Sequence, residues 1–169
     1  MVIFVGIDLG LEGAFCALGG LYDQQHLRDL PRTELARQPI VDVRELRHML
    51  RVVVPANETA VVLIEDVRAR PTGRGGSAGV TAFSSETKLI RLRGHVEALV
   101  LLLGWRLEIV QPQTWKRHFG LIGAEQPKKA SLAKARQLFP AFEDKLHLAK
   151  HHNRAEAVLM AHYARGRWA

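Results

Sequence analysis

The chain has 169 residues, of which 47% are hydrophobic and 24% charged, an ordinary composition for a globular domain with its own core. No apolar run approaches the ~18 residues that a membrane-spanning helix needs. The first apolar run has no basic region before it and contains Asp8, so we expect no secretion signal and no membrane partner. The single cysteine, Cys16, leaves no intrachain disulfide and favours a reducing, cytoplasmic setting. We expect a single domain over residues 1–169.

The charge of the chain favours a polyanionic partner. Lys and Arg together number 24 against 17 Asp and Glu, a formal net charge of +7. Such a balance favours nucleic acid, although ribosomal or acidic-lipid partners fit the sign equally well.

The apolar pattern predicts the order β-β-β-α-β-α-β-α-α-α. Short β-branched or apolar runs separated by glycines predict an antiparallel meander of three strands, at residues 2–7, 14–18 and 21–30. A loop is expected over 31–39, and apolar residues at helical spacing predict an amphipathic helix over 41–53.

The second half of the chain alternates helices and strands. Residues 60–64 form a continuous apolar run, which predicts a central strand parallel to the first. The glycine- and arginine-rich stretch 68–79 is predicted as a basic loop, followed by a helix over 85–103 with Ser85 as its N-cap. The remaining predictions are a strand over 105–110 and helices over 113–120, 127–138 and 153–164.

Acidic residues end both predicted central strands. Asp8 follows the first strand and Glu65-Asp66 the fourth, while Glu156 lies on the last helix. Asp8 alone could equally be a turn cap. Adjacent strand residues face opposite ways, so we assign Glu65 to the site and Asp66 to a structural role.

Three carboxylates that converge at the carboxyl ends of strands repel one another unless a cation neutralises them. Hard oxygen ligands suit Mg²⁺ or Mn²⁺, and two such ions can activate water and stabilise the leaving oxygen of a phosphodiester. On a basic protein, this pattern indicates a nuclease.

Three ordered motifs resemble the RuvC-type Holliday-junction resolvases of the ribonuclease H-like superfamily. They are Val5-Gly6-Ile7-Asp8-Leu9-Gly10, Leu63-Ile64-Glu65, and the stretch from Asn153 to Ala161. The segment 110–116, Val-Gln-Pro-Gln-Thr-Trp-Lys, is similar to a motif of phage-borne members. The resemblance covers nearly the whole chain, and each motif alone is weak.

The resemblance implies an α/β ribonuclease H-like fold with a central mixed five-stranded sheet flanked by helices. It implies a homodimer that grips four-way or other branched DNA and nicks two strands, using Mg²⁺ or Mn²⁺, in a bacterial cytoplasm or that of a phage host. Asp8, Glu65 and Glu156 would be metal ligands and catalytic residues. The family usually has a fourth acid three or four positions before the last one, where this chain has Asn153 and His152.

This departure leaves three interpretations open. His152, or less favourably His151, stands in for the acid as ligand or general base, since residue 152 shares a helix face with Glu156. Alternatively, Asn153 is an engineered replacement of Asp that keeps the shape of a metal ligand, or the native protein has low activity. The two histidines could also form only a solvated helix start.

Basic residues near the acids are candidate DNA contacts, with Phe83 or Val80 as an apolar wedge between base pairs. A solvated loop and a solvated helix face are the alternatives for several of them. Trp115 is interpreted as a core anchor. The candidate contacts are Arg68, Arg70, Arg74, Phe83, Lys88, Arg91, Arg93, Lys116, Arg117, Lys128 and Lys129.

Other functions fit parts of the pattern. The first motif also resembles actin-like ATPases, but the chain is too short for their duplicated domains. A ribonuclease H-like nuclease acting on RNA and a catalytically silent DNA-binding protein remain the alternatives to a junction resolvase.

Overall fold

The computed structural model describes residues 1–20, 23–67 and 77–169, and only the backbone course of residues 77–85. A five-stranded mixed sheet lies at its centre, in the order β3-β2-β1-β6-β7. β1 pairs antiparallel with β2 and parallel with β6, and β7 continues the parallel half. The five strands are β1 (Val2–Asp8), β2 (Ala14–Gly19), β3 (Gln24–Asp29), β6 (Thr59–Glu65) and β7 (Arg106–Val110).

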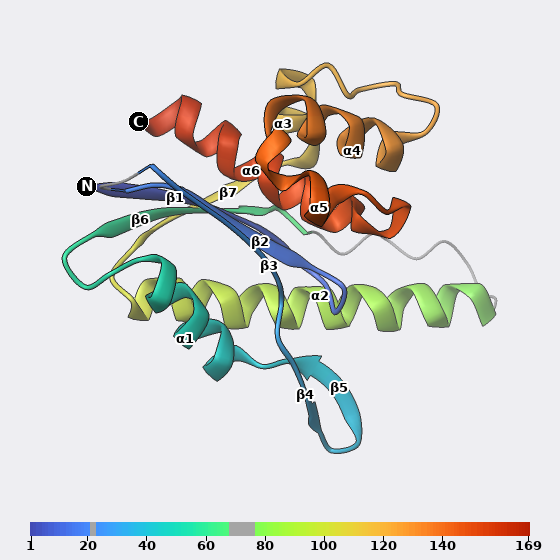
Figure 1. Cartoon of the computed structure of the whole chain (residues 1–169). Coiled ribbons are helices and arrows are strands. Elements are labelled where there is room, and N and C mark those ends of the chain that lie inside the picture. The colour runs from blue at the N-terminus through green and yellow to red at the C-terminus, as the bar shows by residue number, and fades with distance from the viewer. Residues whose placement is uncertain (21–22, 68–76) are drawn as a thin grey trace.

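Helices cover both faces of this sheet (Figure 1). One face carries α3 (Pro112–His118), α4 (Pro127–Leu138), the short α5 (Glu143–Leu146) and the long C-terminal α6 (His152–Trp168). The other face carries α1 (Val43–Val53) and α2 (Ser77–Leu102). The predicted α/β architecture, a mixed five-stranded sheet flanked by helices, is confirmed. None of the helices in the described part of the chain is long and apolar enough to cross a membrane.

The two central strands are buried on both faces because helices pack above and below them. Side chains alternate along β1, so that Phe4 joins the core under α6 while Val5 and Ile7 join the core under α1 and α2. The same alternation runs along β6. The prediction that this strand is central and parallel to the first is confirmed.

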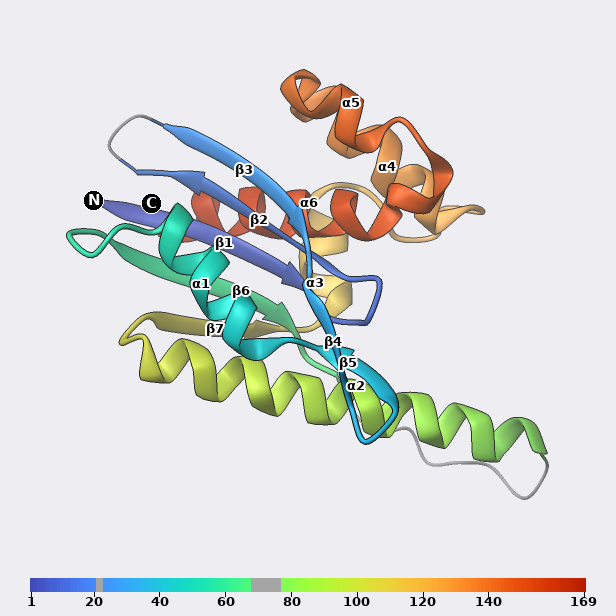
Figure 2. The same ribbon diagram turned by 60° about the horizontal axis from the view of Figure 1, so that its bottom comes forward.

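A second, two-stranded sheet replaces the loop predicted over 31–39. β4 (Arg32–Leu35) and β5 (Gln38–Val41) form a hairpin that stands away from the main sheet (Figures 1 and 2). Its two turn residues, Ala36 and Arg37, both have positive φ angles, of 49° and 61°. Hairpin turns of this kind usually contain Asn or Gly, so the sequence carries no signal for this one. The hairpin and α5 are the elements that the predicted order lacks.

Helix α2 begins earlier than predicted. It starts at Ser77, so the predicted loop is wrong for residues 77–79, and Ser85 lies inside the helix rather than at its N-cap. Helix α1 begins at Val43 because the Asp42 carboxylate accepts hydrogen bonds from the backbone N–H groups of Arg44 and Glu45, at 3.0 and 3.1 Å.

A glycine lets α6 approach the sheet closely. A Cβ atom on Gly6 would overlap the carbonyl oxygen of Ala157, the backbone nitrogen of Ala161 and the Cβ of Met160. The backbones of β1 and α6 are therefore in direct contact, and this contact fixes the height of the helix above the strand.

We expect Gly6→Ala to destabilise the protein by about 3 kcal/mol, because the backbone atoms that it meets cannot move aside without shifting the whole helix. Urea unfolding followed by circular dichroism measures this. The control is Gly94→Ala on α2, where, among the described residues, no atom beyond the neighbouring backbone of the helix lies within 4 Å of the added Cβ. That variant should gain roughly 0.5–1 kcal/mol from helix propensity. A Gly6→Ala protein as stable as the wild type would contradict the close contact.

Candidate acidic site

Asp8 and Glu65 end neighbouring parallel strands and face the same side of the sheet. Ile7 of β1 is paired with Ile64 of β6. Asp8 and Glu65 are the next residues of the two strands, so they lie at the same level of the sheet. Asp8 shares the face of Gly6, two residues earlier, which lies against α6. Glu65 shares the face of Leu63, which belongs to the core under α6. Both carboxylates therefore lie under the helix that carries Glu156.

Glu156 lies on the second turn of α6 and is held by residues from two other helices. The Ser131 hydroxyl of α4 donates to its Oε1 at 3.2 Å, and the Lys116 ammonium of α3 lies 3.3 Å from the same oxygen. Its side chain is 14% exposed, which is enough for solvent or a ligand to reach the carboxylate.

Helix α3 supplies two consecutive residues to the site. The indole N–H of the fully buried Trp115 donates to Oε1 of Glu65 at 2.9 Å, so this core anchor also orients an acid. The Lys116 ammonium lies 5.0 Å from the centre of the same indole ring while it pairs with Glu156. Sequence analysis missed both polar roles, although the motif that contains Trp115 and Lys116 had been noted for its resemblance.

The pKa values of two of the acids show that the group is crowded. Burial raises the pKa of Asp8 well above its usual range, and the charges of Glu156 and Glu65 raise it further. Burial likewise raises the pKa of Glu65, while Lys116 and the Trp115 hydrogen bond lower it. The charge of Glu156 therefore reaches both Asp8 and Glu65, while the use of the three acids as one metal site stays a prediction.

The donor atoms of this site suit a hard divalent cation, since all three acids present carboxylate oxygens. Nonetheless, within the described ranges no three His, Cys, Asp or Glu side chains are already gathered closely enough to hold one ion. Two of the carboxylates are instead engaged by Trp115, Ser131 and Lys116. Among the described residues, Lys116 places a positive charge next to Glu156 and lowers the pKa values of Asp8 and Glu65.

The residues before Glu156 have other contacts. The His152 ring nitrogen Nδ1 lies 3.4 Å from the carbonyl oxygen of Ala149, at the start of its own helix. His151 is buried, and its Nδ1 accepts a hydrogen bond from the backbone N–H of Leu148 at 3.3 Å. Burial lowers the pKa of His151, which favours this neutral, accepting form. Asn153 donates from Nδ2 to the carbonyl oxygen of Glu12 at 2.7 Å.

The predicted DNA contacts fall into separate groups. Lys88 and Arg91 are exposed on α2 and line a cavity of about 400 Å³ between α2, β5 and the turn after Asp8. Lys128 and Lys129 are exposed on the first turn of α4, and the charge of Lys128 lowers the pKa of Asp8. These residues border the edge of the sheet where the acids lie.

Other candidates lie elsewhere or are already paired. Arg117 borders a different hollow with Tyr163 and Arg167, about two helical turns along α6 from Glu156. Arg93 forms an ion pair with Asp66 at 2.6 Å, which agrees with the structural role predicted for Asp66 on the opposite face. Arg68, Arg70, Arg74 and the side chains of Val80 and Phe83 lie outside the described residues.

Comparisons with known proteins bear on this site. A comparison with models of known protein families finds none that matches. The chain is 30% identical over 138 residues to a protein described as Holliday junction resolvase MOC1, chloroplastic, from Chlamydomonas reinhardtii, a match over 79% of this chain but 15% of that protein. The RuvC structure of Thermus thermophilus matches with a TM-score of 0.45 and 14% identity, over 98% of this chain and 96% of that one.

The raised pKa values predict how metal-free protein responds to pH. In the unfolded chain the two groups titrate near their ordinary pKa values, 3.8 for Asp and 4.5 for Glu, whereas in the folded protein Asp8 and Glu65 hold their protons more tightly. The free energy of unfolding should therefore fall as the pH rises from those ordinary values through the raised ones. Asp8→Asn should flatten this fall and raise stability at neutral pH.

Urea unfolding in EDTA between pH 4 and 8 measures the effect, with Glu125→Gln as the control because Glu125 is exposed and outside the cluster. If Asp8→Asn and the wild type give parallel pH profiles, the pKa of Asp8 is not raised in the folded protein.

Proposed function

We propose that the protein is a metal-dependent endodeoxyribonuclease that cuts four-way DNA junctions, in a single nuclease domain formed by residues 1–169. What supports this proposal is that Asp8 and Glu65 end two neighbouring central strands on the face under α6, and that the charge of Glu156 reaches both of them. A net charge of +7 and basic side chains on both sides of this edge support a DNA substrate. The partial similarity to a chloroplast Holliday junction resolvase favours a branched substrate over a linear one.

In this proposal the three carboxylates hold Mg²⁺ or Mn²⁺. A bound pair of such ions supplies an activated water and charge stabilisation at the leaving oxygen of a phosphodiester. Trp115 keeps the carboxylate of Glu65 in a fixed orientation, and Ser131 does the same for Glu156. Lys116 lowers the pKa of Glu65 and of Asp8, which keeps more of each group in the ionised form that binds a cation.

The basic residues suggest a path for the DNA backbone. Lys128 on α4 lies near the acids, since its charge lowers the pKa of Asp8, and Lys88 and Arg91 on α2 line the cavity beside the turn after Asp8. Phosphate contacts from such exposed side chains give affinity and orientation rather than sequence preference. We propose that the strand to be cut passes between these helices, over the carboxyl ends of β1 and β6.

We expect Asp8→Asn to lower the rate of junction cleavage by on the order of 10²–10³-fold, because the reaction loses a charge that holds the cation. Junction affinity should be kept or increased, since one negative charge near the phosphates is removed. A nicking assay on an immobile four-way junction, with and without Mg²⁺, measures the rate, and gel shifts in EDTA measure binding. Asp144→Asn is the matched control, because Asp144 is exposed on α5.

The same assay separates the alternatives. Preferred cutting of an RNA–DNA hybrid or of linear duplex would give the protein another nuclease function. Junction binding without cutting, together with no heat of Mn²⁺ binding, would make it a catalytically silent DNA-binding protein. Wild-type cutting by Asp8→Asn would show that the site lies elsewhere.

We further propose a homodimer, formed through the ends of α1 and α2. The two helix ends lie side by side, since the Arg51 guanidinium donates to the carbonyl oxygen of Leu103 at 3.5 Å. Large apolar side chains are exposed next to this contact: Val52 at 65%, Leu101 at 65% and Leu102 at 87%. Apolar side chains exposed to this degree at one place indicate an interaction surface.

A phage origin and a cytoplasmic location stay predictions from the sequence.

We expect the double change Leu101→Ser and Leu102→Ser to weaken the dimer by about tenfold or more in Kd, because two apolar anchors are lost. Sedimentation equilibrium at micromolar protein measures the constant. Ile122→Ser, which removes an apolar side chain of 51% exposure in another part of the surface, is the control. A monomeric wild-type protein, or equal dimers of both variants, would contradict this interface.

A further inference from the structure

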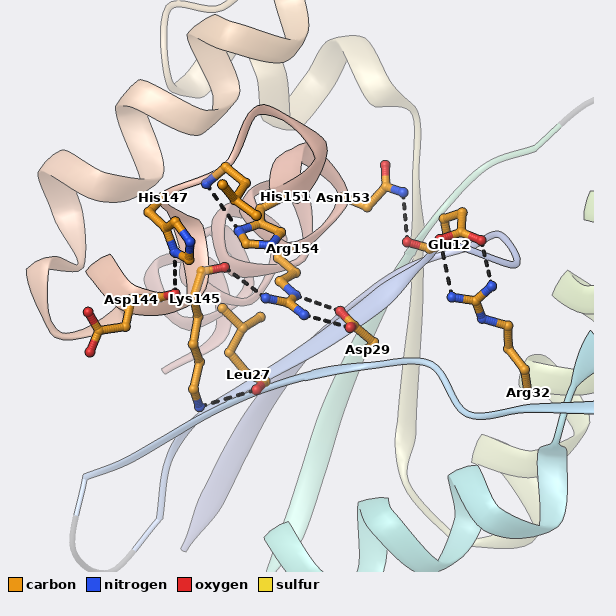
Figure 3. Close-up of polar contacts among 11 residues, drawn as sticks. Glu12, Leu27, Asp29, Arg32, Asp144, Lys145, His147, His151, Asn153 and Arg154 are labelled. Carbon is orange, nitrogen blue, oxygen red and sulfur yellow. Dashed lines mark hydrogen bonds and ion pairs between the residues drawn. The ribbon is translucent and has the colours of Figure 1, made fainter.

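Asn153 occupies the position where the resemblance leads one to expect a fourth acid, and the structure gives its amide a specific partner. Its Nδ2 donates to the backbone carbonyl oxygen of Glu12 at 2.7 Å (Figure 3). The two residues are 141 positions apart in the sequence, so this one bond joins the first turn of α6 to the turn between β1 and β2.

The turn that accepts this bond directly follows Asp8. Within it, the backbone N–H of Gly13 donates to the carbonyl oxygen of Gly10 at 3.1 Å. The Glu12 carboxylate accepts hydrogen bonds from both Nη atoms of Arg32, at 2.6 and 3.2 Å. This ion pair links the turn to β4. Asn153 of α6 thus binds the backbone of the turn, and Arg32 of the hairpin binds the Glu12 side chain of the same turn.

The next residue of α6 makes a second tie to the sheet. Arg154 donates from Nε and Nη2 to the two carboxylate oxygens of Asp29 on β3, both at 2.6 Å, and from Nη1 to the carbonyl oxygen of Lys145 at 3.0 Å (Figure 3). Two consecutive residues therefore fix the start of α6 against two different parts of the sheet. Glu156 follows within one helical turn.

We propose that Asn153 is a positioning residue that holds the turn after Asp8 at a set distance from the helix that carries Glu156, and that the ligand set for a cation consists of Asp8, Glu65 and Glu156 alone. This rests on the proposed nuclease function. An amide suits the place because only a donor satisfies the Glu12 carbonyl, whereas an ionised Asp would set a carboxylate against a carbonyl oxygen.

Two substitutions distinguish a hydrogen-bond donor from a metal ligand at position 153, because the two roles predict different orders of Tm for the two variants. Without metal, Asn153→Ala should lower Tm by about 4 °C, and Asn153→Asp should lower it more, since the bond is replaced by repulsion. The helix dipole acts the other way, because it favours a negative charge in the first turn of α6. The control is Asn57→Asp, the same change at the only other asparagine of the chain, which is exposed in a turn.

Metal binding and turnover give the second readout. Isothermal titration should show that Asn153→Asp binds Mn²⁺ no more tightly than the wild type. In the junction assay both variants should lose turnover by about tenfold or more, with junction affinity unchanged, because the acids are misplaced while the DNA contacts remain. Tighter Mn²⁺ binding and faster cutting by Asn153→Asp would overturn the proposal and make residue 153 a ligand position.

These experiments test the role of Asn153 and the proposed nuclease function separately. If wild-type protein cuts no DNA, the nuclease assignment is wrong, and the order of the metal-free Tm values still decides whether Asn153 acts as a donor to the turn. If the protein cuts junctions and Asn153→Asp is as stable as the wild type, the positioning role is wrong while the nuclease assignment stands.

Discussion

The structure depends on the direct contact between the backbones of β1 and α6. Because residue 6 has no side chain, Ala157 and Ala161 lie against the strand, and the helix cannot move outward without losing the buried face that it shares with the sheet. Asp8 and Glu156 are each within two residues of this contact. Carboxylates that would otherwise move apart to reduce their repulsion are therefore held together by the packing of apolar atoms.

The alternation of side chains on the central strands divides the protein into two functional halves. On the α6 face, β1 and β6 end in Asp8 and Glu65, whose charges are only partly compensated and whose pKa values are raised. On the opposite face, Asp66 forms an ion pair with Arg93, which also pairs with Glu97 within α2. Two adjacent acids thus have different partners, Trp115 for Glu65 and Arg93 for Asp66, because a strand turns its consecutive side chains to opposite sides.

The sequence predicts the parts of this protein that depend on local pattern. Long apolar runs identify β1 and β6, and helical spacing identifies α1 and α4. The β4–β5 hairpin escapes because its turn consists of Ala36 and Arg37, residues that seldom adopt positive φ angles. The early start of α2 escapes because the glycines before it favour a loop in any local prediction. Asp8 and Glu65 are predicted because each ends an apolar strand, and Glu156 because it lies in a motif of the last helix. The hydrogen bond from Trp115 to Glu65 joins residues 50 positions apart and leaves no local trace.

Asn153, at the place where the resemblance leads one to expect a fourth acid, affects the charge balance of the site as well as its contacts. With three carboxylates ionised and Lys116 protonated, the cluster carries a formal charge of −2, whereas a further acid would make it −3. Each added carboxylate in a partly buried group raises the pKa values of the others, which weakens the metal-free fold at neutral pH. An amide that binds a backbone carbonyl avoids that repulsion and adds a fixed link to the turn after Asp8. Two uncharged contacts then maintain the positions of Asp8 and Glu156. Gly6 packs against Ala157, and Asn153 donates to the carbonyl oxygen of Glu12.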